Sequence, residues 1–310
     1  MKITKSYIGI MMLLSLLTAQ GSRAQQDSQY TQYMYNTMTI NSAYTGTRDM
    51  LSIIGLYRNQ WVGLNGAPET MNFTIHSPVG NRLGLGLSIV SDKIFISDET
   101  TVNGAISYQI PVDDGKTLSL GVNGGFNLLS VDFSKANTGA FDPNDPNLQY
   151  NIENRLSPQV GVGAYYYTKK FYAGLSSPNL LETKHYNSNV NSTASERIHL
   201  YFITGYVFDL DYFIKLKPAL LVKAVSGAPL SVDVSANVLF SEKFTLGVAY
   251  RWDAAVSAMA GFQISDKFMV GYAYDWETTK LSRYNSGSHE IFLRFELFNL
   301  RKKILSPRFF

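Results

Sequence analysis

The chain has 310 residues, with 27 basic and 24 acidic side chains and no cysteine. The lack of cysteine excludes disulfides, thiolate metal sites and a cysteine nucleophile, and the nearly balanced charge, without a Lys/Arg-rich run, excludes the electrostatic footprint of a nucleic-acid-binding protein. The composition includes 20 Tyr, 18 Phe and 24 Gly, yet the mean hydropathy is only -0.06. This profile is typical of a membrane β-barrel, because alternating strands look average in bulk hydropathy.

Residues 1–24 are predicted to be a cleaved signal peptide. They contain Lys2 and Lys5, an apolar run from Ile8 to Leu17, and Ser22-Arg23-Ala24, which has the small-x-small form of a signal peptidase site. The run is roughly ten residues long, well short of the about 20 that a spanning helix needs, so an uncleaved membrane anchor is the less favoured alternative. The mature chain would begin at Gln25, and the loss of three basic residues leaves 24 basic against 24 acidic side chains.

The segment from Gln25 to Asp49 differs from the rest of the chain. It is rich in Gln, Asn, Tyr and Met and has no two-residue period, so it is not expected to form a strand. Many inward positions of the strands that follow carry Gly, Ala or Ser, which leaves space inside a barrel. The segment is therefore expected in the periplasm, in the barrel lumen or in both, and we favour partial filling of the lumen.

Residues 50–297 break into runs of period two. Between Leu118 and Leu128, for example, apolar residues alternate with Ser119, Gly121 and Asn123. Alternation fits a soluble sandwich as well as a membrane barrel, because both have one apolar face. Fourteen strands are predicted, beginning near Met50, Glu69, Arg82, Asp98, Lys116, Asn154, Phe171, Ser195, Phe213, Pro229, Phe244, Ala254, Lys267 and Gly287.

The connections between these strands alternate in size. Tight links, such as Val79-Gly80-Asn81, follow the even-numbered strands, whereas longer links at 131–153, 179–194 and 277–286 follow odd-numbered ones. Outer-membrane barrels have short periplasmic turns and long outer loops. The predicted fold is thus an all-β transmembrane antiparallel barrel over residues 50–297, in the outer membrane of a Gram-negative bacterium, with a periplasmic tail at 298–310.

Aromatic residues near the strand ends are expected to form the interface girdles of this barrel, where a ring is half wet. The alternative is that they belong to a soluble core. One group brackets a tight turn and consists of Tyr165, Tyr166, Tyr167, Phe171 and Tyr172. The other group lies beside predicted loops and consists of Tyr250, Trp252, Tyr274 and Trp276.

Several motifs, most of them in the first third of the chain, stand in the order and approximate spacing of a known protein family. They are Asp27-Ser28-Gln29-Tyr30-Thr31-Gln32-Tyr33, Asn36, Asn41-Ser42-Ala43-Tyr44-Thr45-Gly46, Arg58-Asn59-Gln60-Trp61, Gly66-Ala67-Pro68, His76-Ser77-Pro78 and the final Ser306-Pro307-Arg308-Phe309-Phe310. In these motifs the chain resembles the PorP/SprF-like proteins of the Bacteroidetes type IX secretion and gliding machinery. The resemblance spans almost the whole mature chain and departs from the family pattern at Ser28, Thr37, Ser42 and Thr45.

The resemblance implies an outer-membrane barrel that works with the type IX system. It would bind the periplasmic lipoprotein ring, a secreted adhesin by its C-terminal domain, or both, without a cofactor. The motif residues would contact a partner or pack the N-terminal segment onto the barrel wall, and both possibilities stay open; they are Asp27, Gln32, Tyr33, Asn36, Asn41, Tyr44, Gly46, Arg58, Gln60, Trp61 and Pro68.

The remaining motifs indicate no catalytic residue and no transition-metal site, and calcium binding by one loop stays open. The histidines His76, His185, His199 and His289 are scattered, without metal-ligand spacing. The cluster of Ser286, Ser288 and His289 has no assignable orienting group for a hydrolase, and the loop from Asp142 to Asn147 offers calcium-like oxygens without the spacing of an EF-hand. Gly84-Leu85-Gly86 lacks the third glycine and helix of a dinucleotide fingerprint.

Three charged residues, Arg251, Arg294 and Glu296, fall on the polar phase of their strands and are expected in the lumen. Confined charges must be paired or hydrated, so they would form an ion-pair network or a selectivity constriction. The sequence thus favours a non-enzymatic component of the type IX secretion or gliding apparatus that acts through protein contacts. A diffusion channel or hydrophobic-solute transporter is the alternative, and an outer-membrane hydrolase is a third, remote one.

Overall fold

The computed structural model describes residues 30–136, 151–182 and 197–297. The predicted signal peptide, residues 25–29, the loop from Asp142 to Asn147 and the tail 298–310 lie outside these ranges. In the described ranges no helix is both long and apolar enough to span a membrane. The strands are β1 (Leu51–Asn59), β2 (Glu69–Val79), β3 (Leu83–Ile94), β4 (Ser97–Asp113), β5 (Lys116–Val131), β6 (Ile152–Tyr167), β7 (Phe171–Ser177), β8 (His199–Tyr206), β9 (Phe208–Asp209), β10 (Ile214–Val225), β11 (Ser231–Phe240), β12 (Phe244–Arg251), β13 (Ala255–Ser265), β14 (Phe268–Glu277) and β15 (Ser288–Leu297).

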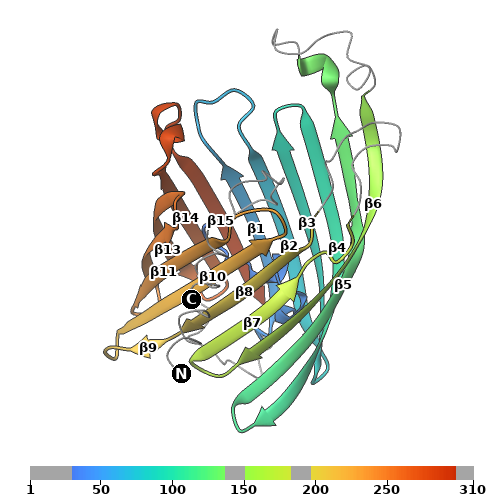
Figure 1. Cartoon of the computed structure of the whole chain (residues 1–310). Coiled ribbons are helices and arrows are strands. Elements are labelled where there is room, and N and C mark those ends of the chain that lie inside the picture. The colour runs from blue at the N-terminus through green and yellow to red at the C-terminus, as the bar shows by residue number, and fades with distance from the viewer. Residues whose placement is uncertain (1–29, 137–150, 183–196, 298–310) are drawn as a thin grey trace, which may run out of the picture.

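The described strands close into a single antiparallel barrel (Figure 1). Closure is made by β1 and β15, which pair from Leu51 with Leu297 to Asn59 with His289. Both β8 and the two-residue β9 pair with β10, so they act as one spanning strand interrupted at Val207. The prediction of fourteen strands is therefore confirmed. The largest shift in a strand start is at the eighth, predicted from Ser195 and observed from His199.

The two rims of the barrel differ, and we name them by their connections. The short-turn rim carries the links such as 80–82 and 114–115 and both ends of the barrel chain, and the long-loop rim carries 60–68, 132–151, 178–198 and 278–287. The wall height also varies, because β4, β5 and β6 have 17, 16 and 16 residues whereas β7 and β8 have 7 and 8. In an outer-membrane barrel the long-loop rim faces outward.

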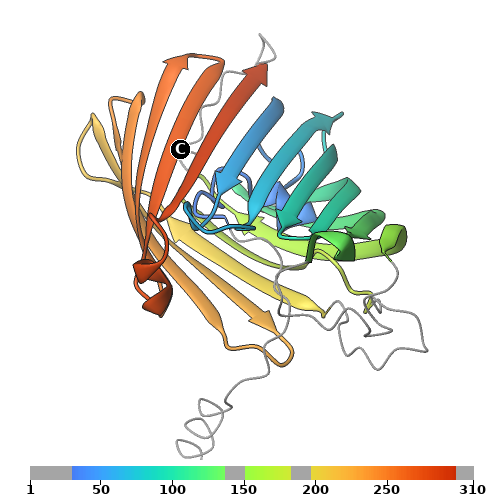
Figure 2. The same ribbon diagram turned by 90° about the horizontal axis from the view of Figure 1, so that it is seen from above.

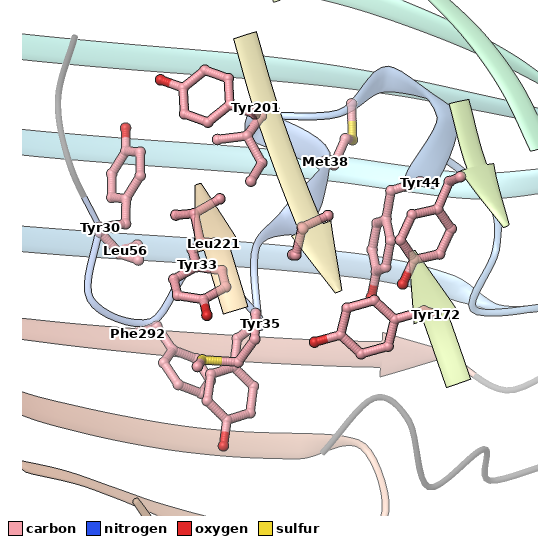
Figure 3. Close-up of a cluster of buried hydrophobic side chains, with 14 of the residues drawn as sticks. Tyr30, Tyr33, Tyr35, Met38, Tyr44, Leu56, Tyr172, Tyr201, Leu221 and Phe292 are labelled. Atoms are coloured by element: carbon pink, nitrogen blue, oxygen red, sulfur yellow. The ribbon is translucent and has the colours of Figure 1, made fainter. Parts of the chain in front are cut away.

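Residues 30–49, which we call the plug, lie inside the barrel (Figures 1 and 2). All are buried except Thr39 and Asp49. The plug contains two 3-10 turns, η1 (Thr37–Thr39) and η2 (Ser42–Tyr44), rather than a strand. Its aromatic and Met side chains pack against inward residues of the wall such as Phe292, with the Tyr35 and Phe292 rings stacked at 4.6 Å (Figure 3).

The predicted girdle at 165–172 is partly wrong. Tyr165, Tyr167 and Tyr172 are buried and face the lumen, and only Tyr166 and Phe171 are left on the outer side. The reason is that successive side chains of a strand point to opposite faces, so three consecutive tyrosines cannot all lie at the lipid interface. The Tyr165 ring contacts the plug instead, edge-on to Tyr44 at 5.5 Å.

Candidate functional site

The plug begins near the long-loop rim, and we call this end, with Thr31 and Gln32, its outer end and the Arg48 end its inner end. A buried charged cluster on the wall holds the outer end. Arg58 of β1, 2% exposed, pairs with Asp275 of β14 at 2.7 Å and with Glu290 of β15 at 3.2 Å. Glu290 also accepts hydrogen bonds from the backbone N–H groups of Thr31 (2.9 Å) and Gln32 (2.8 Å), and the Thr31 hydroxyl donates to Asp275 (2.7 Å). The oxygens of both carboxylates therefore accept hydrogen bonds from one guanidinium and from donors of the plug.

A second ion pair lies beside this cluster, between Arg251 of β12 and Asp233 of β11 at 2.8 Å. Close to it, the hydroxyl of Tyr33 lies 3.5 Å from Ser235 Oγ. Burial raises the pKa of Tyr33, and the contact with Ser235 only partly opposes this shift. Tyr33 therefore stays neutral, and the charges in this layer come from the wall alone.

The inner end of the plug carries its own charge, Arg48, which pairs with Glu296 of β15. Arg294 Nε lies 3.6 Å from the same carboxylate oxygen, Glu296 Oε1. Burial by itself lowers the pKa of Arg48, but the charge of Glu296, the hydrogen bond to it and the contacts with Tyr44 together outweigh burial, and the pKa is raised. This ion pair fixes the plug where it joins β1 at the short-turn rim.

Between the two ends, the plug bonds to the wall through neutral groups. Asn36 Nδ2 donates to Asn72 Oδ1 at 2.9 Å and Asn36 Oδ1 accepts from the Thr74 hydroxyl at 3.0 Å. Wall hydroxyls also reach plug carbonyls: Ser176 Oγ donates to Ile40 O at 2.7 Å, and Ser107 Oγ donates to Thr45 O at 2.6 Å. A polar barrel interior and a polar segment thereby satisfy each other.

Glycines on the wall let the plug backbone approach closely. A Cβ at Gly121 of β5 would overlap the backbone of Ser42 and Ala43, and one at Gly84 of β3 would overlap the Thr45 carbonyl. Gly46 lies at φ 73°, and a Cβ there would come within 2.7 Å of the Gly84 Cα. The turn 42–46 therefore fits the wall only because these positions lack side chains.

Asn41 caps η2 and ties it to the wall. Its Oδ1 accepts from the Ala43 N–H at 2.9 Å, and its Nδ2 donates to Ala164 O at 3.1 Å. We expect Asn41→Ala to lower the free energy of unfolding by about 1–2 kcal/mol, because a cap and a buried hydrogen bond are lost together. Denaturant unfolding in detergent micelles measures this. Asn65→Ala, in an exposed loop, is the matched control, and an equal effect at both sites would contradict the assigned role.

The loop 60–68 joins β1 to β2 at the long-loop rim and is bonded to the ends of β14 and β15. Trp61 has a left-handed φ of 51°. Its N–H donates to Ser288 Oγ at 3.1 Å and its indole Nε1–H donates to Glu277 Oε2 at 3.2 Å. At the base of the loop, the Gln60 N–H donates to Pro68 O at 2.9 Å. A bulky residue at positive φ is a strained conformation that the surrounding bonds must hold.

The structure thus places most motif residues around the plug. Arg58 contacts the outer end of the plug. Gln60, Trp61 and Pro68 belong to the rim loop, and Asp27 lies outside the described residues. Six motif residues lie in the plug itself: Gln32, Tyr33, Asn36, Asn41, Tyr44 and Gly46. Arg251, Arg294 and Glu296 are buried inside the barrel in ion pairs.

Sequence reasoning missed Arg48, Asp233, Asp275 and Glu290. Period-two alternation could have identified Asp233, Asp275 and Glu290, because each lies on the inward face of its strand. Glu290, for example, lies four residues before Arg294 and six before Glu296 on the same face of β15. Ser288 and His289 are adjacent on β15 and so face opposite sides; His289 Nδ1 lies 2.6 Å from the Tyr272 hydroxyl.

A comparison with known proteins adds a family match. The model of the family described as type IX secretion system membrane protein PorP/SprF matches residues 22–295. No curated protein matches. Similar solved structures include the outer membrane protein Omp33 of Acinetobacter baumannii (TM-score 0.48, 10% identity, covering 82% of this chain and 100% of that one). The toluene transporter TbuX of Ralstonia pickettii is similar too (TM-score 0.48, 10% identity, 84% and 93% covered).

Proposed function

This chain belongs to the PorP/SprF family of type IX secretion system membrane proteins, and on that basis we propose that it is a non-enzymatic, plugged barrel that binds protein partners of that system. As a membrane protein that spans with strands, it lies in the outer membrane, with the short-turn rim in the periplasm. The proposed partners are the periplasmic lipoprotein ring, a secreted adhesin bound by its C-terminal domain, or both, in secretion and gliding.

The observation that carries this proposal is the plug itself. Eighteen of its twenty residues are buried, and wall and plug exchange hydrogen bonds from the Arg58 cluster at one end to Arg48 at the other. A lumen filled in this way supports a resting barrel that handles a partner at its rims rather than one that passes solutes through its centre. The diffusion channel therefore remains the alternative, and a large steady current from purified protein in planar bilayers would favour it.

Co-purification tests the proposal directly. The affinity-tagged full chain is solubilised from native membranes in a gentle detergent, beside an unrelated outer-membrane barrel with the same tag. We expect type IX components or a surface adhesin to be enriched only with this chain. Recovery of neither class would overturn the proposed function.

Trp61 links the rim loop to β14 and β15 and is the motif residue best placed to affect both assembly and partner binding. Trp61→Ala removes the bond to Glu277 and is expected to lower barrel stability by about 1–3 kcal/mol or to reduce partner recovery. Heat-modifiable gel mobility and the co-purification assay report these two effects. Trp252→Ala is the control, since Trp252 is 71% exposed on the outer side. If Trp61→Ala changes neither readout, this role for Trp61 is wrong.

A further inference from the structure

Charge is divided unevenly between the plug and the wall. Residues 30–47 contain no Asp, Glu, Lys or Arg, and the first plug charge is Arg48. At the outer end, the charged side chains pair with each other across strands of the wall, Arg58 with Asp275 and Glu290, and Arg251 with Asp233. These ion pairs do not depend on the plug, so its departure would break none of them.

The plug contributes only neutral donors and acceptors to this outer layer. Glu290 accepts the N–H groups of Thr31 and Gln32, and Asp275 accepts the Thr31 hydroxyl. Water can supply the same donors, and exchanging a protein hydrogen bond for a water hydrogen bond changes the free energy little. The middle of the plug is held by wall hydroxyls and amides such as Ser176 and Asn72. Its aromatic and Met side chains also pack on the wall, where Lys217 and Arg294 lie over the Tyr35 ring.

The inner end is different, because there the plug brings its own ion pair to the wall, between Arg48 and Glu296. Arg48 also lies only three residues before β1, so this end is tied to the wall covalently as well. A plug with a charged, tethered inner end and a neutral outer end can therefore detach from the wall at its outer end while Arg48 stays in place.

The wall behind the plug carries several glycines beside its buried aromatic side chains. Gly84, Gly86, Gly121 and Gly163 all lie where an added Cβ would meet plug atoms, so the space taken by the plug is not filled by the wall. In a barrel of this strand number, a lumen lined by such groups holds water once it is vacated. We propose that residues 30–47 are a displaceable plug, and that the chain conducts small hydrated ions when the outer end of the plug detaches from the wall.

Conductance of the full-length protein in planar bilayers with potassium chloride tests the proposal. Glu290→Gln removes the charge that accepts two plug amides while Arg58 keeps Asp275 as its partner. Gly84→Ala acts near the inner end of the plug, where the added Cβ would overlap the Thr45 carbonyl and displace the turn. We expect a nearly silent wild type, and openings about tenfold to a hundredfold more frequent in each variant. The controls are Glu242→Gln, on an exposed ion pair, and Gly104→Ala, where the nearest atom to a Cβ is 3.8 Å away.

A labelling experiment reports plug movement independently of current. The chain has no cysteine, so Ser176→Cys, beneath Ile40 of the plug, provides a unique buried thiol for a small water-soluble reagent. We expect it to react faster in the Glu290→Gln and Gly84→Ala backgrounds than in the wild-type background. Folded variants that stay silent and unlabelled would overturn the proposal, and so would a large steady wild-type current. Partner recovery is a separate assay, so the displaceable plug and the proposed binding of protein partners can each fail without the other.

Discussion

Replacing Arg58 with methionine is expected to lower the free energy of unfolding by about 3–5 kcal/mol, the cost of breaking a buried ion pair from one side. Asp275 and Glu290 are 3% and 0% exposed, and Arg58 is the cation that pairs with both. Without it, two carboxylates remain close together inside the barrel. Denaturant unfolding in detergent micelles, followed by heat-modifiable gel mobility, measures the loss.

Two further variants make this prediction specific. Lys116→Met breaks the ion pair with Asp113, which lies in water at the short-turn rim, and should change stability very little. Arg58→Met combined with Glu290→Gln should recover part of the loss, because only one of the two buried charges remains. If the single and double variants are equally destabilised, the cluster is not the cause.

Gly121→Ala is expected to cost about 1–3 kcal/mol, the usual cost of overpacking, although it adds only one methyl group. The new Cβ would overlap backbone atoms of Ser42 and Ala43 rather than a flexible side chain. The turn of the plug must therefore shift away from β5, or the wall must bend. Unfolding measurements give the cost, and limited proteolysis of the plug shows whether the turn has moved.

Gly124→Ala is the matched control on the same strand. Nothing lies within 4 Å of a Cβ at Gly124, so alanine there should be neutral or stabilise the strand by up to about 1 kcal/mol. Similar losses at Gly121 and Gly124 would mean that β5 tolerates no side chain in general. The close approach of the plug would then not explain the glycine.

Much of the barrel wall could be predicted from the sequence, because its signal is local. A strand that separates lipid from lumen must alternate at period two, and the turn residues mark its ends, so fourteen strands and most of their starts were readable. The same local rule could have corrected the girdle prediction, since it sends Tyr165 and Tyr167 inward and leaves Tyr166 outside.

The contacts of the plug were not readable in this way. Asp275 and Glu290 stand more than 240 residues from Thr31 in the chain, yet they bind it. Nothing in the spacing of Tyr30 to Asp49 shows which wall residue each side chain meets, because the plug has no period that fixes its register. Family resemblance singled out Arg58 and Asn36, but not the carboxylates that give Arg58 its role.

By itself, the sequence determined the strands, their inward and outward faces, their number and the two kinds of rim, since each follows from alternation and turn chemistry within a few residues. Only the tertiary structure decided that residues 30–49 lie inside the closed barrel, that Arg58 is shared by Asp275 and Glu290, and that Gly121 contacts the plug backbone. These facts depend on closing β15 onto β1, which brings distant parts of the chain to one interior where buried charges must find partners and backbones must fit.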